Sequence, residues 1–284
     1  MNEFDDRYYP LKRRFPNRVK KFSRDRELRF ERIRTPGFLL EVSRLILPAA
    51  VPDASGKRLL FVSDFHWYDS PRNHRLLNEL SDFSKRYSPD ILLCGGDLCN
   101  DAEYLDSLPP LLTALAELAP VSAAVSGNWE TGKRWLKPDF FKEMLKNHGI
   151  KLLSNESLTV NGFYIFGLPD VSSLDFRNLP PPEIPDNTQN ILLVHSPDAV
   201  VSADKGSFLK NFHLAFCGHT HGGQIRLPLV GSLYCPSFYR CKFDRGIFSR
   251  QGNSLKMLVS SGIGEHRNTP RILCPPEIIT VEFE

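Results

Sequence analysis

From residue 57 onward the chain alternates between short apolar runs and polar clusters, with a spacing that predicts alternating strands and helices. Three runs have the length and composition of buried strands: residues 57–63, 90–94 and 121–125. Ser70 with Pro71 predicts the start of a helix that carries Leu76, Leu77, Leu80 and Phe83 inward. Further helices are expected at residues 110–118 and 138–148, so the first half indicates strand-helix-strand units of a parallel sheet.

After residue 150 the pattern becomes rich in strands, and a second sheet is expected to begin there. Asn161-Gly162 predicts a hairpin turn. The expected strands are residues 152–153, 158–160, 163–166, 191–194, 213–217, 257–261 and 277–283. Residues 169–186 hold five prolines and no periodicity, which predicts a surface loop that serves as a lid or a substrate wall.

The region before residue 57 differs in composition from the rest of the chain. Residues 1–58 carry 15 Lys and Arg against 8 Asp and Glu, whereas the remainder carries 21 against 25. Residues 37–47 are mostly apolar and end at Pro48, a length that fits an interfacial helix better than a membrane span. We expect residues 1–56 to form a basic segment with a short apolar helix, contacting a membrane surface through residues 1–50, and residues 57–284 to form a catalytic domain. The alternative is a solvated tail followed by a helix docked on the body.

The expected compartment follows from what the sequence lacks. No apolar region of a secretory signal opens the chain, no stretch is long and uncharged enough to span a bilayer, and the six cysteines form no CxxC pair. These features predict reduced thiols and a cytoplasmic protein, and the basic and apolar segment before residue 57 adds the expectation of peripheral association with the inner membrane. The basic residues are not interleaved with aromatic residues in a base-reading pattern, so no nucleic-acid partner is expected.

Polar residues of one chemical kind follow five of the apolar runs. They are Asp64, His66, Asp97, Asn128, His195, His219 and His221. The steps from Asp64 to Asp97 and from Asp97 to Asn128 are 33 and 31 residues, each the span of one strand-helix-strand unit. Because parallel strands bring their carboxyl ends to one edge, these side chains are expected to converge. Carboxylates, an amide and four imidazoles suit a pair of divalent ions such as manganese, iron or zinc.

The order D-x-H, GD, GN, H and GHTH resembles the five motifs of the calcineurin-like metallophosphoesterases and covers residues 59–284. The continuation GHTHGGQ, with a tail running from Gly262 to Glu277, resembles a bacterial branch of phosphohydrolases. Some members of that branch act at membranes, and some are UDP-2,3-diacylglucosamine pyrophosphatases of lipid A synthesis. The resemblance implies an α/β fold: a two-sheet β-sandwich flanked by helices in four layers, α/β/β/α.

The resemblance also implies roles for the seven residues. Asp64, His66 and His221 would hold one metal ion, Asn128, His195 and His219 would hold a second, and Asp97 would bridge them. Asp97, Asn128 and His219 are the residues expected to act in catalysis. Two ions of this kind, manganese first and iron or zinc otherwise, activate a bridging water for in-line attack on a phosphoryl group.

One position departs from the family pattern, because the usual His after Gly-Asn is Trp129. An indole has no proton to give a leaving oxygen near neutral pH. We therefore expect a substrate with a good leaving group, most simply the pyrophosphate of a nucleotide-linked lipid. Contacts with substrate are expected from Trp129, Glu130, Asp170, His266 and Arg267. Two alternatives stay open: the same chemistry on a soluble phosphodiester or phosphomonoester, and a metal-free binding module of the same fold.

Overall fold

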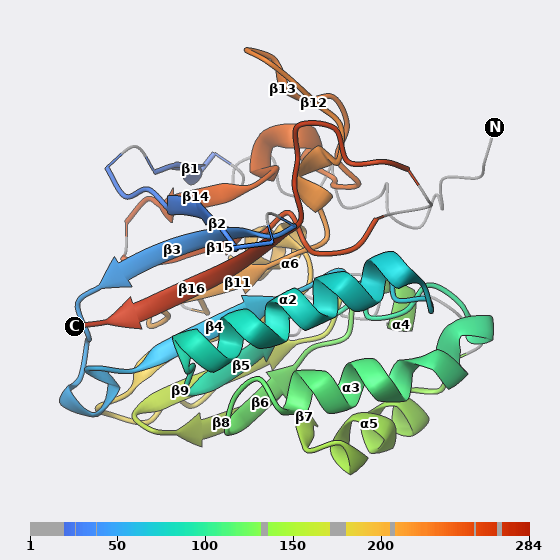
Figure 1. Ribbon diagram of the computed structural model, residues 1–284. Coiled ribbons are helices and arrows are strands. Elements are labelled where there is room, and N and C mark those ends of the chain that lie inside the picture. The colour runs from blue at the N-terminus through green and yellow to red at the C-terminus, as the bar shows by residue number, and fades with distance from the viewer. Residues whose placement is uncertain are drawn as a thin grey trace.

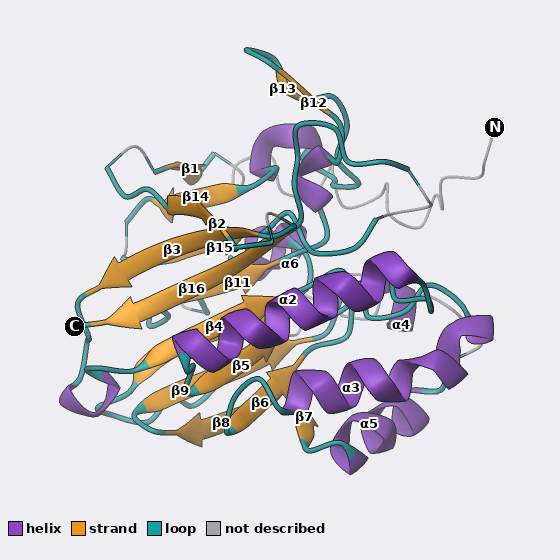
Figure 2. Ribbon diagram, in the orientation of Figure 1, coloured by secondary structure: helices purple, strands orange, loops and turns teal. Residues whose placement is uncertain are grey.

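The structure is a computed structural model, and it describes residues 20–25, 27–37, 39–131, 136–170, 180–204, 208–252, 254–265 and 269–284. Two seven-stranded sheets pack face to face, with helices on the outer faces (Figures 1 and 2). The first sheet has the order β2 (Glu31–Arg34), β3 (Glu41–Leu47), β16 (Glu277–Phe283), β4 (Arg58–Val62), β5 (Ile91–Cys94), β6 (Val121–Ala124), β7 (Ile150–Leu152). The second has the order β1 (Phe22–Arg24), β14 (Gly246–Arg250), β15 (Lys256–Val259), β11 (Leu214–Cys217), β10 (Gln189–Val194), β9 (Phe163–Leu168), β8 (Glu156–Val160). This confirms the expected two-sheet sandwich.

Both sheets are mixed, and their parallel parts matter most for the site. Strands β4 to β7 pair in parallel, as do β9, β10, β11 and β15 of the second sheet. The carboxyl ends of β4, β5 and β6 therefore lie along one edge of their sheet. The turn at Asn161-Gly162 joins β8 to β9 as predicted.

Helices α2 and α5 begin where the sequence predicts, and α3 begins two residues earlier than predicted. Helix α2 (Pro71–Tyr87) is capped by Ser70, whose hydroxyl accepts the amide of Asn73 at 3.2 Å. Helices α3 (Leu108–Ala116) and α5 (Pro138–Asn147) cover the same face of the first sheet (Figure 1). Two shorter helices are α4 (Asn128–Thr131) and α6 (Pro197–Ala203), and 3₁₀ turns occupy η2 (Pro52–Ala54), η3 (Ala102–Ser107), η4 (His221–Gly223) and η5 (Arg240–Phe243). No described helix is both long enough and apolar enough to cross a membrane.

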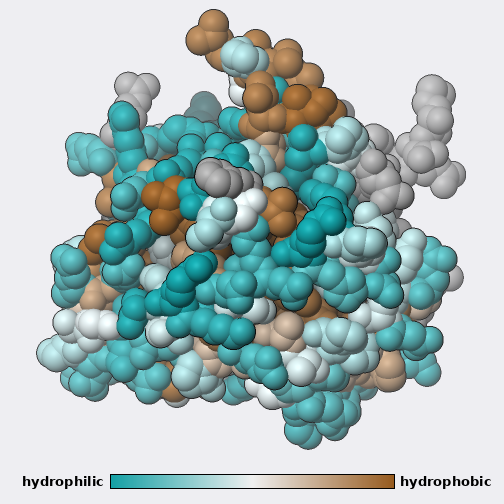
Figure 3. All heavy atoms as spheres, viewed as in Figure 1, coloured by the Kyte–Doolittle hydropathy of each residue, from teal (hydrophilic) through white to brown (hydrophobic). Residues whose placement is uncertain are grey.

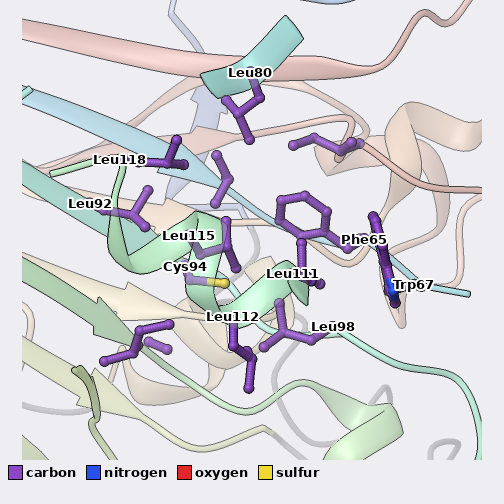
Figure 4. Close-up of a cluster of buried hydrophobic side chains, with 14 of the residues drawn as sticks. Phe65, Trp67, Leu80, Leu92, Cys94, Leu98, Leu111, Leu112, Leu115 and Leu118 are labelled. Carbon is purple, nitrogen blue, oxygen red and sulfur yellow. The ribbon is translucent and has the colours of Figure 1, made fainter. Parts of the chain in front are cut away.

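Alternating residues of the central strands fill two different cores. On β5, Leu92 and Cys94 pack under the helices, whereas Ile91 and Leu93 face the second sheet. Figure 4 shows the first of these clusters, to which α2 contributes Leu80 and α3 contributes Leu111 and Leu115. Burial on both faces explains why these strands read as continuous apolar runs. The six cysteines are free thiols, as predicted.

Residues 41–47 form a strand, so the interfacial helix predicted for residues 37–47 is wrong. Strand β3 pairs with β16 along its whole length and with β2 on its other side. Its side chains follow a period of two: Val42 packs under the helices and Leu45 faces the second sheet. Leu40, Val42 and Leu45 are therefore core residues, with Leu39 and Leu47 packed against the cores, whereas Ile46 is 41% exposed. Strand β1 likewise pairs with β14, so residues 22–24 belong to the second sheet, and residues 31–34 and 41–47 belong to the first. Residues 1–19 lie outside the described residues.

Candidate metal centre

The structure brings all seven predicted ligands to one edge of the sandwich. Asp64 and His66 follow β4, Asp97 follows β5, and Asn128 opens α4 after β6. The second sheet supplies His195 after β10, with His219 and His221 after β11. Segments up to 157 residues apart in the chain, from Asp64 to His221, thus meet because the parallel strands of both sheets end at the same edge of the sandwich.

One group of ligand atoms comes from Asp64, His66 and His221, and its atoms lie within 4.8 Å of one another. The Nε2 atoms of His66 and His221 are 2.9 Å apart, and His221 Nε2 is 3.7 Å from Asp64 Oδ1. Two ligands about 2.1 Å from a shared ion, at angles between 90° and tetrahedral, lie roughly 3.0–3.4 Å apart. The two measured distances fall on either side of this range, so the three residues are close enough together to hold one divalent ion.

The second group comprises Asp97, His195 and His219, with Asn128 beside it. His195 Nε2 lies 3.1 Å from each of three atoms: Asp97 Oδ2, His219 Nδ1 and Asn128 Oδ1. Asp97 Oδ2 is also 3.8 Å from His66 Nε2 of the first group. The Asp97 carboxylate therefore stands between the two groups, where a bridging ligand would be.

The ligands are buried and their charges are coupled. Apart from Asn128, which is half-buried, none is more than 6% exposed. Burial alone would raise the pKa of Asp97, but the charges of His195 and His66 hold it well below its usual range. Burial would lower the pKa of His195, and the adjacent Asp97 carboxylate instead raises it to about 10. The negative charge of Asp97 thus favours the protonated, positively charged form of His195.

Five of the ligands have backbone conformations that L-residues seldom adopt. Positive φ angles occur at Asp64 (55°), His66 (44°), Asp97 (53°), His219 (71°) and His221 (51°). Such conformations cost free energy at residues with a Cβ atom, and they persist where the surrounding structure fixes them. The turns that leave the strands are thus shaped to aim side chains at the site.

Two glycines allow this close packing of loops. A Cβ atom on Gly127 would lie 2.1 Å from Asp97 Oδ1, and one on Gly218 would lie 2.3 Å from Asp64 Oδ2. Neither carboxylate leaves room for a larger residue. The glycines of the GN and GHTH motifs are therefore steric requirements of the ligand positions.

Groups behind the ligands fix their orientation, and the sequence analysis missed them. His195 Nδ1 lies 2.7 Å from the carbonyl of Gly95, which directs its Nε2 atom toward the site. His66 Nδ1 contacts Asn100 Oδ1, and the Ser63 hydroxyl donates to Asp64 Oδ2 at 2.5 Å. Ser63 and Asn100 adjoin known motifs in sequence, which is the only signal that could have identified them.

Glu130, which the sequence predicts to contact substrate, is buried between the loop after β5 and the loop after β6 and binds their backbone amides. Its carboxylate accepts the amides of Gly127 at 2.7 Å, Asp97 at 2.9 Å and Leu98 at 2.6 Å, and it is 3% exposed. Burial and the neighbouring Asp97 raise its pKa to about 7. Glu130 ties the loop after β5 to the loop after β6, so it positions Asp97 and Asn128.

The other residues expected to contact substrate are placed differently from one another. Trp129 is half-buried at the site: its amide donates to Asp97 Oδ1 at 2.9 Å, and its ring meets the His66 ring edge-on at 5.9 Å. Asp170 is fully buried, away from solvent. Burial and the charge of His195 lower the pKa of His219, and the Asp170 charge partly opposes that shift. His266, Arg267 and residues 171–179 of the proline-rich loop lie outside the described residues.

Comparison with known proteins gives one family and several relatives. Residues 57–223 match the family model described as calcineurin-like phosphoesterase. The chain is 31% identical over 208 residues to Phosphodiesterase YaeI of Escherichia coli strain K12, covering 71% of this chain and 73% of the relative. It is 28% identical to the uncharacterized metallophosphoesterase YkuE of Bacillus subtilis strain 168, covering 67% and 66%. An uncharacterized metallophosphoesterase of Aquifex aeolicus is 27% identical over 262 residues, covering 89% and 92%.

Proposed function

Because the chain belongs to the calcineurin-like phosphoesterase family and is a hydrolase of phosphoesters, we propose that it cleaves a phosphodiester or pyrophosphate bond with two divalent ions, manganese first among them. The observation that carries the proposal is the pair of three-residue groups on either side of the Asp97 carboxylate. When bound there, two divalent ions lower the pKa of a water molecule and offset the charge of phosphoryl oxygens.

The protein's own residues fix the geometry in which that chemistry occurs. Asp97 holds the two halves of the site in register through contacts of Oδ2 with His66 and His195. Asn128 and His219, which flank His195, are the residues proposed to orient the phosphoryl group. The buried surroundings exclude bulk water, so these fixed dipoles act in a medium of low polarity.

The finer proposal is that the substrate is the pyrophosphate of a nucleotide-linked lipid, UDP-2,3-diacylglucosamine of lipid A synthesis. Trp129 supports it, because the indole stands beside His66 at the position where the family pattern has a His that can protonate the leaving oxygen. A phosphate monoester leaves without protonation, whereas an alkoxide does not. A soluble phosphodiester is the second candidate, favoured by the printed name of the relative YaeI.

A lipid substrate implies work at a membrane, and we propose that the protein is cytoplasmic and associates peripherally with the inner membrane. Residues 1–19 hold 5 Lys and Arg, which would meet anionic head groups. Deleting residues 1–50 cannot test this, because the deletion would remove β1, β2 and β3 from both sheets. Deletion of residues 1–19 leaves these strands intact and is expected to lower activity on lipid in vesicles while sparing a soluble diester.

The decisive experiment is mass spectrometry of the products formed by manganese-loaded protein from UDP-2,3-diacylglucosamine in mixed micelles, with Asp97→Ala as the control. UMP and a lipid monophosphate, absent with the variant, are the expected products. Hydrolysis of bis-(p-nitrophenyl) phosphate without cleavage of the lipid would reject the lipid and keep the two-metal chemistry. Loss of neither activity in Asp97→Ala would reject the proposed site.

A further inference from the structure

A narrow hairpin of apolar side chains projects from the body beside the metal centre. Strands β12 (Arg226–Leu227) and β13 (Gly231–Ser232) form it, and Figure 3 shows it as the brown projection above the hydrophilic surface. We call residues 227–234, together with Ile272 and Leu273 that lie beside the hairpin base, the apolar finger. Seven of the ten large apolar side chains that are exposed in the described part of the chain belong to it: Leu227, Leu229, Val230, Leu233, Tyr234, Ile272 and Leu273.

The exposure at the tip is extreme for apolar residues. Leu229 is 109% exposed and Val230 is 68% exposed, so they contact almost nothing in the protein. A contiguous exposed apolar surface of this kind marks a site of interaction with another protein or with a membrane. The finger projects outward, so it cannot act as a groove that encloses a ligand.

The base of the finger is fixed to the metal centre by polar contacts. Arg226 Nη1 donates to the carbonyl of Gly222 and to Asp244 Oδ2, each at 2.8 Å. The Ser232 hydroxyl lies 2.8 Å from the same Gly222 carbonyl. Gly222 directly follows the ligand His221, so the finger rises from the edge of the sandwich that carries the ligands. Whatever the tip enters is held next to the catalytic site.

The charges around the finger favour an anionic surface. Residues 227–239 contain no Asp, Glu, Lys, Arg or His, and residues 221–245 contain four Arg or Lys against one acid, Asp244. That acid is buried and paired with Arg24 and Arg226. The exposed charged residues of the segment, Arg240 and Lys242, are both basic. An apolar tip next to exposed basic side chains is the composition of an element that enters the head-group layer of an anionic bilayer.

We infer that the apolar finger inserts into the surface of an anionic phospholipid bilayer and holds the metal centre against it. The binding partner of the apolar finger is the bilayer itself, so the inference does not depend on which phosphoester is cleaved. It also replaces the segment of residues 37–47 as the apolar part of a membrane contact, because Leu40, Val42 and Leu45 of that segment lie in the core.

Co-sedimentation of the full-length protein with vesicles tests the inference. The vesicles contain phosphatidylglycerol and phosphatidylethanolamine, or phosphatidylcholine alone, and no substrate. The variant is Leu229→Ser with Val230→Ser; the matched control is Phe140→Ser, which removes an apolar side chain that is 55% exposed on α5. We expect at least tenfold weaker binding to the anionic vesicles for the double variant, wild-type binding for Phe140→Ser, and unchanged hydrolysis of a soluble diester by both.

Three outcomes would overturn the inference. They are absence of binding by the wild-type protein, equal binding by the double variant, and an equal loss in Phe140→Ser. Unchanged vesicle binding with a smaller particle mass in light scattering of the double variant would instead show that the finger joins two protein molecules. Because the vesicles hold no substrate, failure of the proposed reaction does not alter any of these results.

Discussion

The metal centre and the apolar finger are neighbours in the chain, yet they depart from ordinary burial in opposite directions. At the centre, ionisable side chains such as Asp97 and His195 are almost fully removed from water, whereas at the finger Leu229 is wholly exposed. Each arrangement disfavours folding, since buried charge requires compensation and exposed leucine gains nothing from the core. Because these residues lower the stability of the folded protein, their positions are best explained by function.

Replacing Asp97 with Ala should give the largest effect at the polar end of this comparison. The change removes the carboxylate whose Oδ2 atom lies between His66 and His195. Activity on bis-(p-nitrophenyl) phosphate should fall by about 10³-fold or more, and bound metal should drop. Steady-state kinetics with elemental analysis measures both. Retention of a tenth of the wild-type rate would contradict the bridging position.

Glu130→Gln should have the next largest effect, although Glu130 is almost fully buried and its carboxylate accepts hydrogen bonds from backbone amides. An amide offers one acceptor oxygen where the carboxylate accepts amides from both loops, so Asp97 and Asn128 should lose their fixed position. Metal affinity, measured by manganese titration, should fall about 10- to 100-fold. Glu143→Gln on the exposed face of α5 is the matched control and should bind as wild type.

Trp129→His should change selectivity more than rate. The variant places a titratable ring beside His66, which should favour substrates whose leaving oxygen needs a proton. The ratio of alkyl monoester hydrolysis to pyrophosphate hydrolysis should rise severalfold. Trp129→Phe, which supplies no proton, should leave the ratio unchanged, and an equal rise in both variants would assign the effect to space alone.

The smallest effect is expected at the finger. Leu229→Ala removes an apolar side chain that contacts almost nothing, so the free energy of unfolding should change by less than about 0.5 kcal/mol. Leu93→Ala, at a fully buried position of β5, should cost about 2–5 kcal/mol. Urea unfolding measures both. A comparable cost for the two would show that the finger packs against the body.

The sequence predicts the core strands and the metal ligands because both leave local signals. An apolar run followed by Asp97 or His195 marks a strand end, and parallel pairing brings these strand ends to one edge of the sheet. The helix predicted for residues 37–47 is wrong because the prediction rests on apolar content alone. The side chains instead follow a period of two, by which Val42 and Leu45 face different cores. The role of Glu130 depends on amides some 30 residues away, and the exposure of Leu229 depends on which apolar runs the core leaves out. Neither is written in the local pattern.

The position of β16 has a consequence for synthesis on the ribosome. This strand, made after every other, lies between β3 and β4 in the middle of the first sheet and pairs with both. Until residues 277–283 emerge, the nascent chain carries two unpaired strand edges, each a template for association with another chain. A premature stop shortly before residue 277 would therefore yield a chain that keeps all seven metal ligands yet cannot close the sheet that positions four of them.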